Sequence, residues 1–444
     1  MSDADSGRDR RGFLAGVGAV GLGALAGCSA LDPIDGDDTE PTVETAPFDD
    51  FGGDLPTIPT PLPVAVASDY LDRAAASARA DLDAVPHPLT GDDVPNGAVR
   101  DALAERYADA TDALDRAGSA STDAGTLDAL RDARRAAAAA RAGWRAVDGS
   151  LTRADVRERA PPVADDVRAF RERWRYVGSP EDAVRALLVH AELEDLVANA
   201  RTSIRSLRSP RSFVDPAPDG PPAVADEAAA LESARVAVAD AAYLYDRFVA
   251  SLDATRSYAG TFDAAEATLA NAVAERASDV SDADHGSDLV DADIDAIAVR
   301  SALDDILFDV QSDASYYREM DRVAGAIREH HGRLAGLRAL DALVAAVESG
   351  DYATVENAED VVAIRSDAVT ALTGARGGRH PRLNALGLRW LPETIRRSDD
   401  ELASYDDPVP VTYLVRDVGR YVRVAYVAAA VPGASERVVG ALSA

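Results

Sequence analysis

The chain has 444 residues, of which 77 are acidic and 46 basic, so its formal net charge is −31, and every basic residue is Arg because the sequence contains no Lys. Binding to a phosphate backbone needs clustered basic residues that displace counterions, so this balance argues against a nucleic-acid partner. The length allows two or three domains of ordinary size.

Near its start the chain contains Arg10, Arg11, Phe13 and Leu14. These residues resemble the core of a twin-arginine export signal, which implies passage through the twin-arginine translocase. The uncharged stretch 12–27 that follows has 16 residues, whereas a helix needs about 20 apolar residues to cross a bilayer. We therefore expect residues 1–27 to be a signal peptide and not a permanent membrane span.

The uncharged stretch ends in a sequence that resembles a lipobox, in which Leu25, Ala26 and Gly27 precede Cys28. The resemblance implies that Cys28 carries the lipid. Cys28 is the single cysteine of the chain, and lipidation would cap a thiol that is otherwise reactive in an oxidising compartment. Stable anchoring needs two lipid chains. We therefore predict a protein held by lipid on the extracellular face of the cell membrane.

The acidic composition without Lys is similar to that of proteins from extremely halophilic archaea. A large net charge repels itself in dilute buffer, but at molar salt the Debye length falls to about 3 Å and the repulsion is screened. Together with the export signal and lipobox, the composition resembles that of a haloarchaeal lipoprotein exported by the twin-arginine route. We expect high salt to be a requirement for folding.

Residues 28–63, which begin with the cysteine predicted to carry the lipid, are dominated by Asp, Thr, Pro, Glu and Gly. Such a composition buries too little apolar surface to offset the loss of chain entropy on folding. This segment is predicted to be a disordered tether.

From residue 64 onward the spacing of apolar residues predicts an all-α fold, because they recur at intervals of three and four along the chain. The clearest stripe consists of Leu231, Ala234, Val238, Ala241, Tyr245, Phe248 and Leu252. Residues 408–431 are rich in Val and Tyr, yet their apolar positions also fall on one helical face. A helix is therefore predicted there too.

A Pro-rich stretch, residues 209–222, interrupts the helical pattern and predicts the boundary between two helical bundles, 64–208 and 222–444. Whether the helices form one extended bundle or two adjoining bundles stays open. Between residues 294 and 349 the periodicity predicts one or two long helices, with Gly332 or Gly336 as the place for a break.

Arg residues gather in the segment that contains Arg168, Arg171, Arg173 and Arg175. Asp165, Asp166 and Glu172 are interleaved with them. The alternation of charges predicts a solvated helix face with salt bridges.

The histidines are the residues to weigh as metal ligands. His190 and Glu194 are four residues apart and share a helix face, a spacing that can chelate a metal in a bundle. The favoured interpretation places His190 at the edge of the apolar stripe, partly exposed. For His330 and His331 we expect one ring to face the core and the other to face solvent.

Exported helical lipoproteins of the imelysin and iron-uptake type are similar in being acidic, anchored helical bundles. Their motif is Gly-x-His-x-x-Glu, whereas here Leu188 stands for the Gly and Glu192 comes one position early after His190. The resemblance therefore concerns the fold alone and transfers no site residue.

Sequence motifs of phosphate-binding loops, zinc proteases, serine hydrolases and dinucleotide-binding enzymes are absent. We therefore assign no catalytic residue, no metal ligand and no cofactor. The favoured function is a non-catalytic surface module that presents helical faces to a cell-envelope partner. The alternative is a metal- or haem-binding bundle in nutrient uptake.

Overall fold

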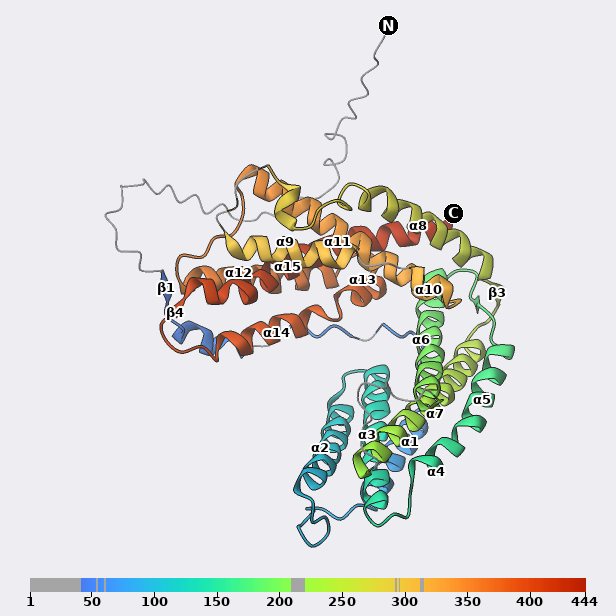
Figure 1. Cartoon of the computed structure of the whole chain (residues 1–444). Coiled ribbons are helices and arrows are strands. Elements are labelled where there is room, and N and C mark those ends of the chain that lie inside the picture. Colours follow the sequence, from blue (N-terminus) through green and yellow to red (C-terminus); the bar gives the residue numbers. More distant parts are fainter. Residues whose placement is uncertain are drawn as a thin grey trace. The chain divides into compact units, whose positions relative to one another are not determined.

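The computed structural model describes residues 41–52, 55–59, 61–208, 220–291, 294, 296–311 and 315–444. The predicted export signal, the lipobox and Cys28 lie outside these residues. Within them the chain is almost entirely helical, which confirms the all-α prediction. Figure 1 shows the helices coloured in chain order.

The first half of the described chain forms the helices α1 to α7. They are α1 (Ser68–Leu82), α2 (Gly97–Ser119), α3 (Asp123–Val147), α4 (Arg153–Glu158), α5 (Ala160–Arg173), α6 (Ala183–Arg208) and α7 (Pro221–Ala250). Helix α3 packs against α1, α2 and α7, and α7 also packs against α6. Alanines and Gly143 on α3 permit close approach, since a Cβ on Gly143 would lie 2.2 Å from a methyl carbon of Leu103 on α2.

Local sequence signals set several helix starts in this half. Asn96 accepts a hydrogen bond from the backbone of Val99 at the start of α2, and Thr122 accepts one from Gly125 at the start of α3. These are side-chain caps of the kind that satisfies the free amides of a first turn. A Pro pair lies in the first turn of both α5 and α7, where it is tolerated because first-turn amides have no partner within the helix.

The second half forms the helices α8 to α15. They are α8 (Ala259–Ala277), the 3₁₀ helix η4 (Gly286–Leu289), α9 (Ile297–Gln311), α10 (Ser315–Glu319), α11 (Val323–Ser349), α12 (Ala358–Arg376), α13 (Pro381–Leu388), α14 (Leu391–Leu402) and α15 (Val411–Ser443). Helix α15 is the centre, since it contacts α8, α9, α11, α12, α13 and α14. The helix predicted over 408–431 is confirmed from Val411 onward as part of α15, whereas Val409–Pro410 form a short strand.

The break predicted near Gly332 or Gly336 is not there, because α11 runs through both glycines without interruption. Gly336 instead serves packing, since a Cβ at this position would lie 2.6 Å from Val310 of α9. The interruption falls earlier, between α9 and the start of α11 at Val323.

Two short antiparallel pairs of strands join distant parts of the chain. β1 (Thr42–Val43) pairs with β4 (Val409–Pro410), and β2 (Val177–Gly178) pairs with β3 (Arg256–Ser257). A Cβ on Gly178 would lie 2.6 Å from the Cβ of Ala186. This position therefore needs glycine for space.

The prediction of a disordered tether is wrong for residues 41–52, and residues 28–40 lie outside the described chain. After β1, residues 46–52 form the 3₁₀ helix η3 (Ala46–Gly52). Val43, Phe48 and Phe51 are buried in the main hydrophobic core. Arg365 stacks over the Phe51 ring and donates a hydrogen bond of 2.7 Å to its carbonyl oxygen. These few apolar side chains supply enough buried surface to fold the segment, although its average composition predicts disorder.

The boundary predicted at residues 209–222 lies between α6 and α7, which pack along one another. Residues 209–219 are outside the described chain. One core cluster contains residues from both predicted bundles, among them Leu193 on α6 and Ile327 on α11. The structure thus differs from two separately packed bundles, because the buried surface is continuous across the predicted boundary. Among the described residues, no helix combines the length and the hydropathy needed to cross a membrane.

Candidate anion-binding groove

His190, on α6, is fully buried, so the prediction that it is partly exposed is wrong. Trp174 Nε1 lies 3.0 Å from His190 Nδ1, and an indole N–H can only donate. The ring proton therefore sits on Nε2, which donates to the carbonyl oxygen of Val177 at 2.7 Å. Burial lowers the pKa of His190 to about 4, so the ring is neutral. Both nitrogens are engaged, and neither is free for a metal.

Glu194 is also buried, one turn further along α6. Its Oε1 accepts from the Tyr176 hydroxyl at 2.6 Å and from the Ala324 amide at 3.0 Å, and its Oε2 accepts from the Gly325 amide at 2.6 Å. Both amides belong to the first turn of α11, whose N-cap residue Arg322 makes no side-chain capping bond. Glu194 therefore caps α11 from a neighbouring helix.

The acidity of Glu194 reflects two opposed effects. Burial raises its pKa to about 7, while the hydrogen bonds from Tyr176, Gly325 and Ala324 act in the opposite direction. The face that His190 and Glu194 share thus holds helices together, and the structure gives its two polar groups separate partners.

His330 and His331 are both buried, so the prediction that one of them faces solvent is wrong. His330 Nε2 lies 3.4 Å from Glu266 Oε1. His331 Nε2 lies 3.0 Å from Ser435 Oγ, and burial lowers the pKa of His331 to about 4. A Ser–His pair can act as nucleophile and base, but Ser435 is 0% exposed. We interpret the contact between His331 and Ser435 as a structural hydrogen bond within the core.

The residues weighed as metal ligands do not converge. Across the described ranges, no group of three or more His, Cys, Asp or Glu side chains is placed to hold a metal ion. His190 bonds to Trp174 and Val177, whereas His330 faces Glu266. These candidate donors therefore give no structural support to the metal- or haem-binding alternative.

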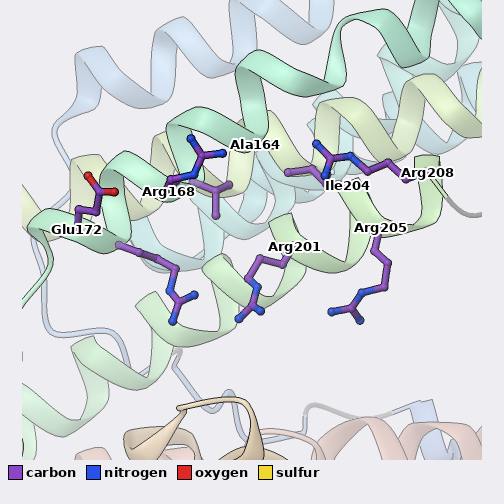
Figure 2. A pocket seen from close by; sticks show the side chains of 9 residues that line it. Ala164, Arg168, Glu172, Arg201, Ile204, Arg205 and Arg208 are labelled. Carbon is purple, nitrogen blue, oxygen red and sulfur yellow. The ribbon is translucent and has the colours of Figure 1, made fainter.

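A groove of about 690 Å³ runs between α5 and α6 and is rich in arginine (Figure 2). Ala164, Val167 and Ile204 give it an apolar floor. The charged residues that line it are Arg168, Arg171, Arg201, Arg205, Arg208 and Glu172. We call this feature the arginine groove. Five arginines and one acid therefore line a hollow in a chain whose net charge is −31.

The helical repeat places these arginines in two rows. Arg201, Arg205 and Arg208 stand at positions i, i+4 and i+7 of α6, so they share a face and span about 10 Å along the helix axis. Arg168 and Arg171 stand three residues apart on α5. The two rows line the same hollow, with the apolar floor between them.

The two rows differ in their ion pairs. On α5, Arg168 lies 3.0 Å from Asp165 and Arg171 lies 3.8 Å from Asp321, and all four side chains are exposed. Exposed pairs of this kind contribute only about 0–1 kcal/mol. The structure therefore leaves the α5 guanidinium groups readily accessible.

Within the described chain, the arginines of the α6 row have no ion pair and no side-chain hydrogen bond. Arg205 and Arg208 lie in the last turn of α6, where a positive charge also favours the helix dipole. Arg201 stands further from the helix end and lacks that explanation. No acid among the described residues therefore lies within ion-pair distance of the α6 row, and Glu172 on α5 is the acid in the lining of the groove.

The predicted salt-bridged face on α5 is confirmed for Arg168, which pairs with Asp165, whereas Arg173 pairs with Asp246 of α7 at 2.5 Å. Sequence reasoning missed the opposite wall. A signal was present, because residues 196–214 contain four Arg and no Asp or Glu in a chain with 77 acidic residues. That run places arginines without acidic neighbours on one helix, although it does not show that α5 faces them.

Two family models match the chain. Residues 69–255 match a family described as Domain of unknown function (DUF8262), and residues 259–440 match one described as Domain of unknown function (DUF8264). No curated protein and no solved structure matches the chain.

The described chain is all-α, and the two matches follow one another along it. The first match covers α1 to α7 and the second covers α8 to α14 and most of α15. The matches meet between residues 255 and 259, and the predicted boundary at 209–222 falls inside the first match. The arginine groove lies wholly within the first match. The Glu194 cap on α11 connects the two matches.

Proposed function

We propose that the protein is a lipid-anchored, non-catalytic binding module on the outer face of the cell membrane, and that the arginine groove binds an anionic cell-envelope partner. One observation carries this proposal. The chain has a net charge of −31, yet three arginines of the groove have no ion pair in the described structure. What sets these three arginines apart is their arrangement, because they stand on one face of α6 and line one hollow together with two arginines of α5.

Arginine suits this role chemically. Its planar guanidinium group stays protonated and donates two parallel hydrogen bonds to a carboxylate, phosphate or sulfate. An exposed ion pair contributes only about 0–1 kcal/mol, so affinity at this site depends on several pairs that form together. Five guanidinium groups around one hollow allow several contacts with an anionic surface at once.

The location rests on the sequence signals. Arg10 and Arg11 fit export by the twin-arginine translocase, and Cys28 fits lipidation. A lipid at Cys28 would put the helical domain beside other components of the cell envelope. That placement supports a partner of the envelope for the groove.

The groove is tested with a triple variant, R201Q/R205Q/R208Q, and labelled dextran sulfate as the anionic probe. The control R73Q/R116Q/R396Q removes the same charge from arginines whose acidic partners are Asp69, Asp132 and Glu393. We expect the groove variant to bind at least about tenfold more weakly, because several charge-assisted hydrogen bonds are lost. The control should stay within about twofold of the native chain. Equal affinity of the two variants would overturn the proposed binding site.

The anchor is tested separately by Cys28→Ser in cells. We expect the variant to leave the membrane fraction while its export continues, because the signal arginines are unchanged. Mass spectrometry of the native N-terminal peptide should show lipid on Cys28. A native chain that stays soluble, or that retains residues 1–27, would contradict the anchor.

A further inference from the structure

We infer that the arginine groove receives an acidic amphipathic helix of a partner protein. This inference rests on the proposed function, since it names the chemistry of the partner at the same groove. Three features of the molecule support it: the spacing of the arginines, the floor between them and the charge of the rest of the chain.

The spacing indicates a ligand with several anionic groups. Arg201 and Arg208 are separated by two helical turns, about 10 Å along the helix axis, so the row offers guanidinium groups at successive positions along the groove. An acidic helix with carboxylates at i, i+4 and i+7 repeats at the same interval. Its acids could therefore face the α6 row in register, one partner for each of Arg201, Arg205 and Arg208.

The apolar floor of the groove indicates that the partner helix carries apolar side chains between its acids. Val167 and Ile204 are buried beside the neighbouring helices, and Ala164 is half-buried at the groove surface. A helix with an apolar stripe flanked by acids matches an apolar floor flanked by arginines, which is the usual way that an amphipathic helix lies in a groove. The hollow between α5 and α6 leaves the room for such side chains.

The hollow is open at its rim, where Arg168, Arg171, Arg205 and Arg208 are exposed. Sites for small ligands bury most of the ligand surface. An open groove instead suits a segment of a larger partner, whose remaining parts can cover the side that faces away from the groove. This openness favours a macromolecular segment over a free metabolite.

The charge of the whole molecule favours a protein helix over duplex nucleic acid or a lipid surface. A stiff duplex extends past the groove and would meet a chain of net charge −31. A flat membrane contacts convex surfaces and leaves a concave apolar floor unfilled. Apolar contact is also strengthened, not weakened, by salting-out salts. A helix that combines Leu and Glu would thus keep affinity where the charges alone are screened.

The test uses the full chain and a designed helical peptide with a Leu stripe flanked by Glu. One control peptide has Gln for every Glu, and a second keeps Glu but has Ala for every Leu. Phosphatidylglycerol vesicles and duplex DNA are measured in parallel, and each probe is offered to the native chain, to R201Q/R205Q/R208Q and to R73Q/R116Q/R396Q.

We expect the Glu and Leu peptide to bind the native chain and the control variant, and to lose at least about tenfold in affinity with the groove variant. Both control peptides should bind at least about tenfold more weakly than it does. If vesicles or DNA bind through the groove while the peptide does not, the inference of an acidic helix is wrong. The proposed anion-binding site would still hold in that case. If no probe distinguishes the groove variant from the control variant, the inference and the proposed function both fail.

Discussion

Glu194 shows how a single side chain can join two regions of this chain. It projects from α6, within the first family match, and accepts backbone hydrogen bonds from the first turn of α11, within the second match. On the adjacent position, Asp195 forms salt bridges with Arg322 and Arg328 of the same partner segment. The start of α11 is therefore fixed by acids from α6 and not by a cap of its own.

Replacing Glu194 by Ala should destabilise the protein by about 3 kcal/mol, because buried amides of α11 and the Tyr176 hydroxyl lose their acceptor. Urea unfolding at molar salt measures this change. The control is Glu181→Ala, at an exposed acid just before α6, and it should change stability by less than about 0.5 kcal/mol. Equal stability of both variants would contradict the capping role.

Glu194→Gln tests the raised pKa. The folded-state pKa is about 7 and the ordinary value is 4.5, so between these values the unfolded chain binds fewer protons and this residue's contribution to stability falls as pH rises. Gln cannot ionise. Relative to Glu194→Gln, the native chain should therefore lose on the order of 3 kcal/mol between pH 4.5 and 7, at about 1.36 kcal/mol per pKa unit. Parallel pH profiles of unfolding for the two chains would show that the pKa is not raised.

At the scale of residues, the sequence predicted which side chains share a helix face, but it did not predict what surrounds those side chains. The interval of four residues between His190 and Glu194 correctly placed both on one face of α6. Their burial depends on Trp174, Tyr176 and the start of α11, which approach from other parts of the chain. No local pattern around residue 190 carries that information, so the predicted exposure was wrong.

At the scale of elements, the segment before α1 is the clearest departure from expectation. Residues 41–52 have the composition of a linker, yet β1 pairs with β4 and Phe48 is fully buried. The ring of Phe51 contacts Tyr421 of α15 edge to face, with ring centroids 6.5 Å apart. A few aromatic residues thus fold a segment whose average composition predicts disorder.

Phe48→Ala should lower the free energy of unfolding by about 3–5 kcal/mol, because it removes a fully buried aromatic ring. Asp49→Ala, at the exposed neighbouring position, is the matched control and should change stability by less than about 0.5 kcal/mol. Thermal unfolding at molar salt compares the two. If Phe48→Ala were as stable as the native chain, residues 41–52 would be a tether after all.

The helices themselves were predictable because their apolar positions repeat along the chain. The stripe from Leu231 to Leu252 was predicted as buried surface, and its members lie in or against the core. The glycines were less informative about where helices end. Helix α11 continues through Gly336, and the absence of a side chain there allows Val310 of α9 to pack closely. A glycine alone does not distinguish a break from a close helix contact.

At the scale of the whole molecule, charge is the dominant feature, and its exceptions carry the function proposed above. The prediction of an acidic surface without affinity for nucleic acid follows from 77 acidic residues against 46 arginines. The arginine groove exists because α5 and α6 lie side by side. Amino-acid composition does not predict which helices become neighbours. The sequence run 196–214 supplies one wall, and only the fold supplies the other.

The most direct test of the central claim is the reactivity of individual arginines in the full chain toward phenylglyoxal, followed by peptide mass spectrometry at molar salt. Arg201, Arg205 and Arg208 should react before Arg131 and Arg365, which are mostly buried and paired with Asp240 and Asp399. Addition of the Glu and Leu helical peptide should protect the three groove arginines and leave the exposed Arg73 unchanged. Groove arginines that react as slowly as Arg131, or that the peptide leaves unprotected, would contradict an anion-binding groove.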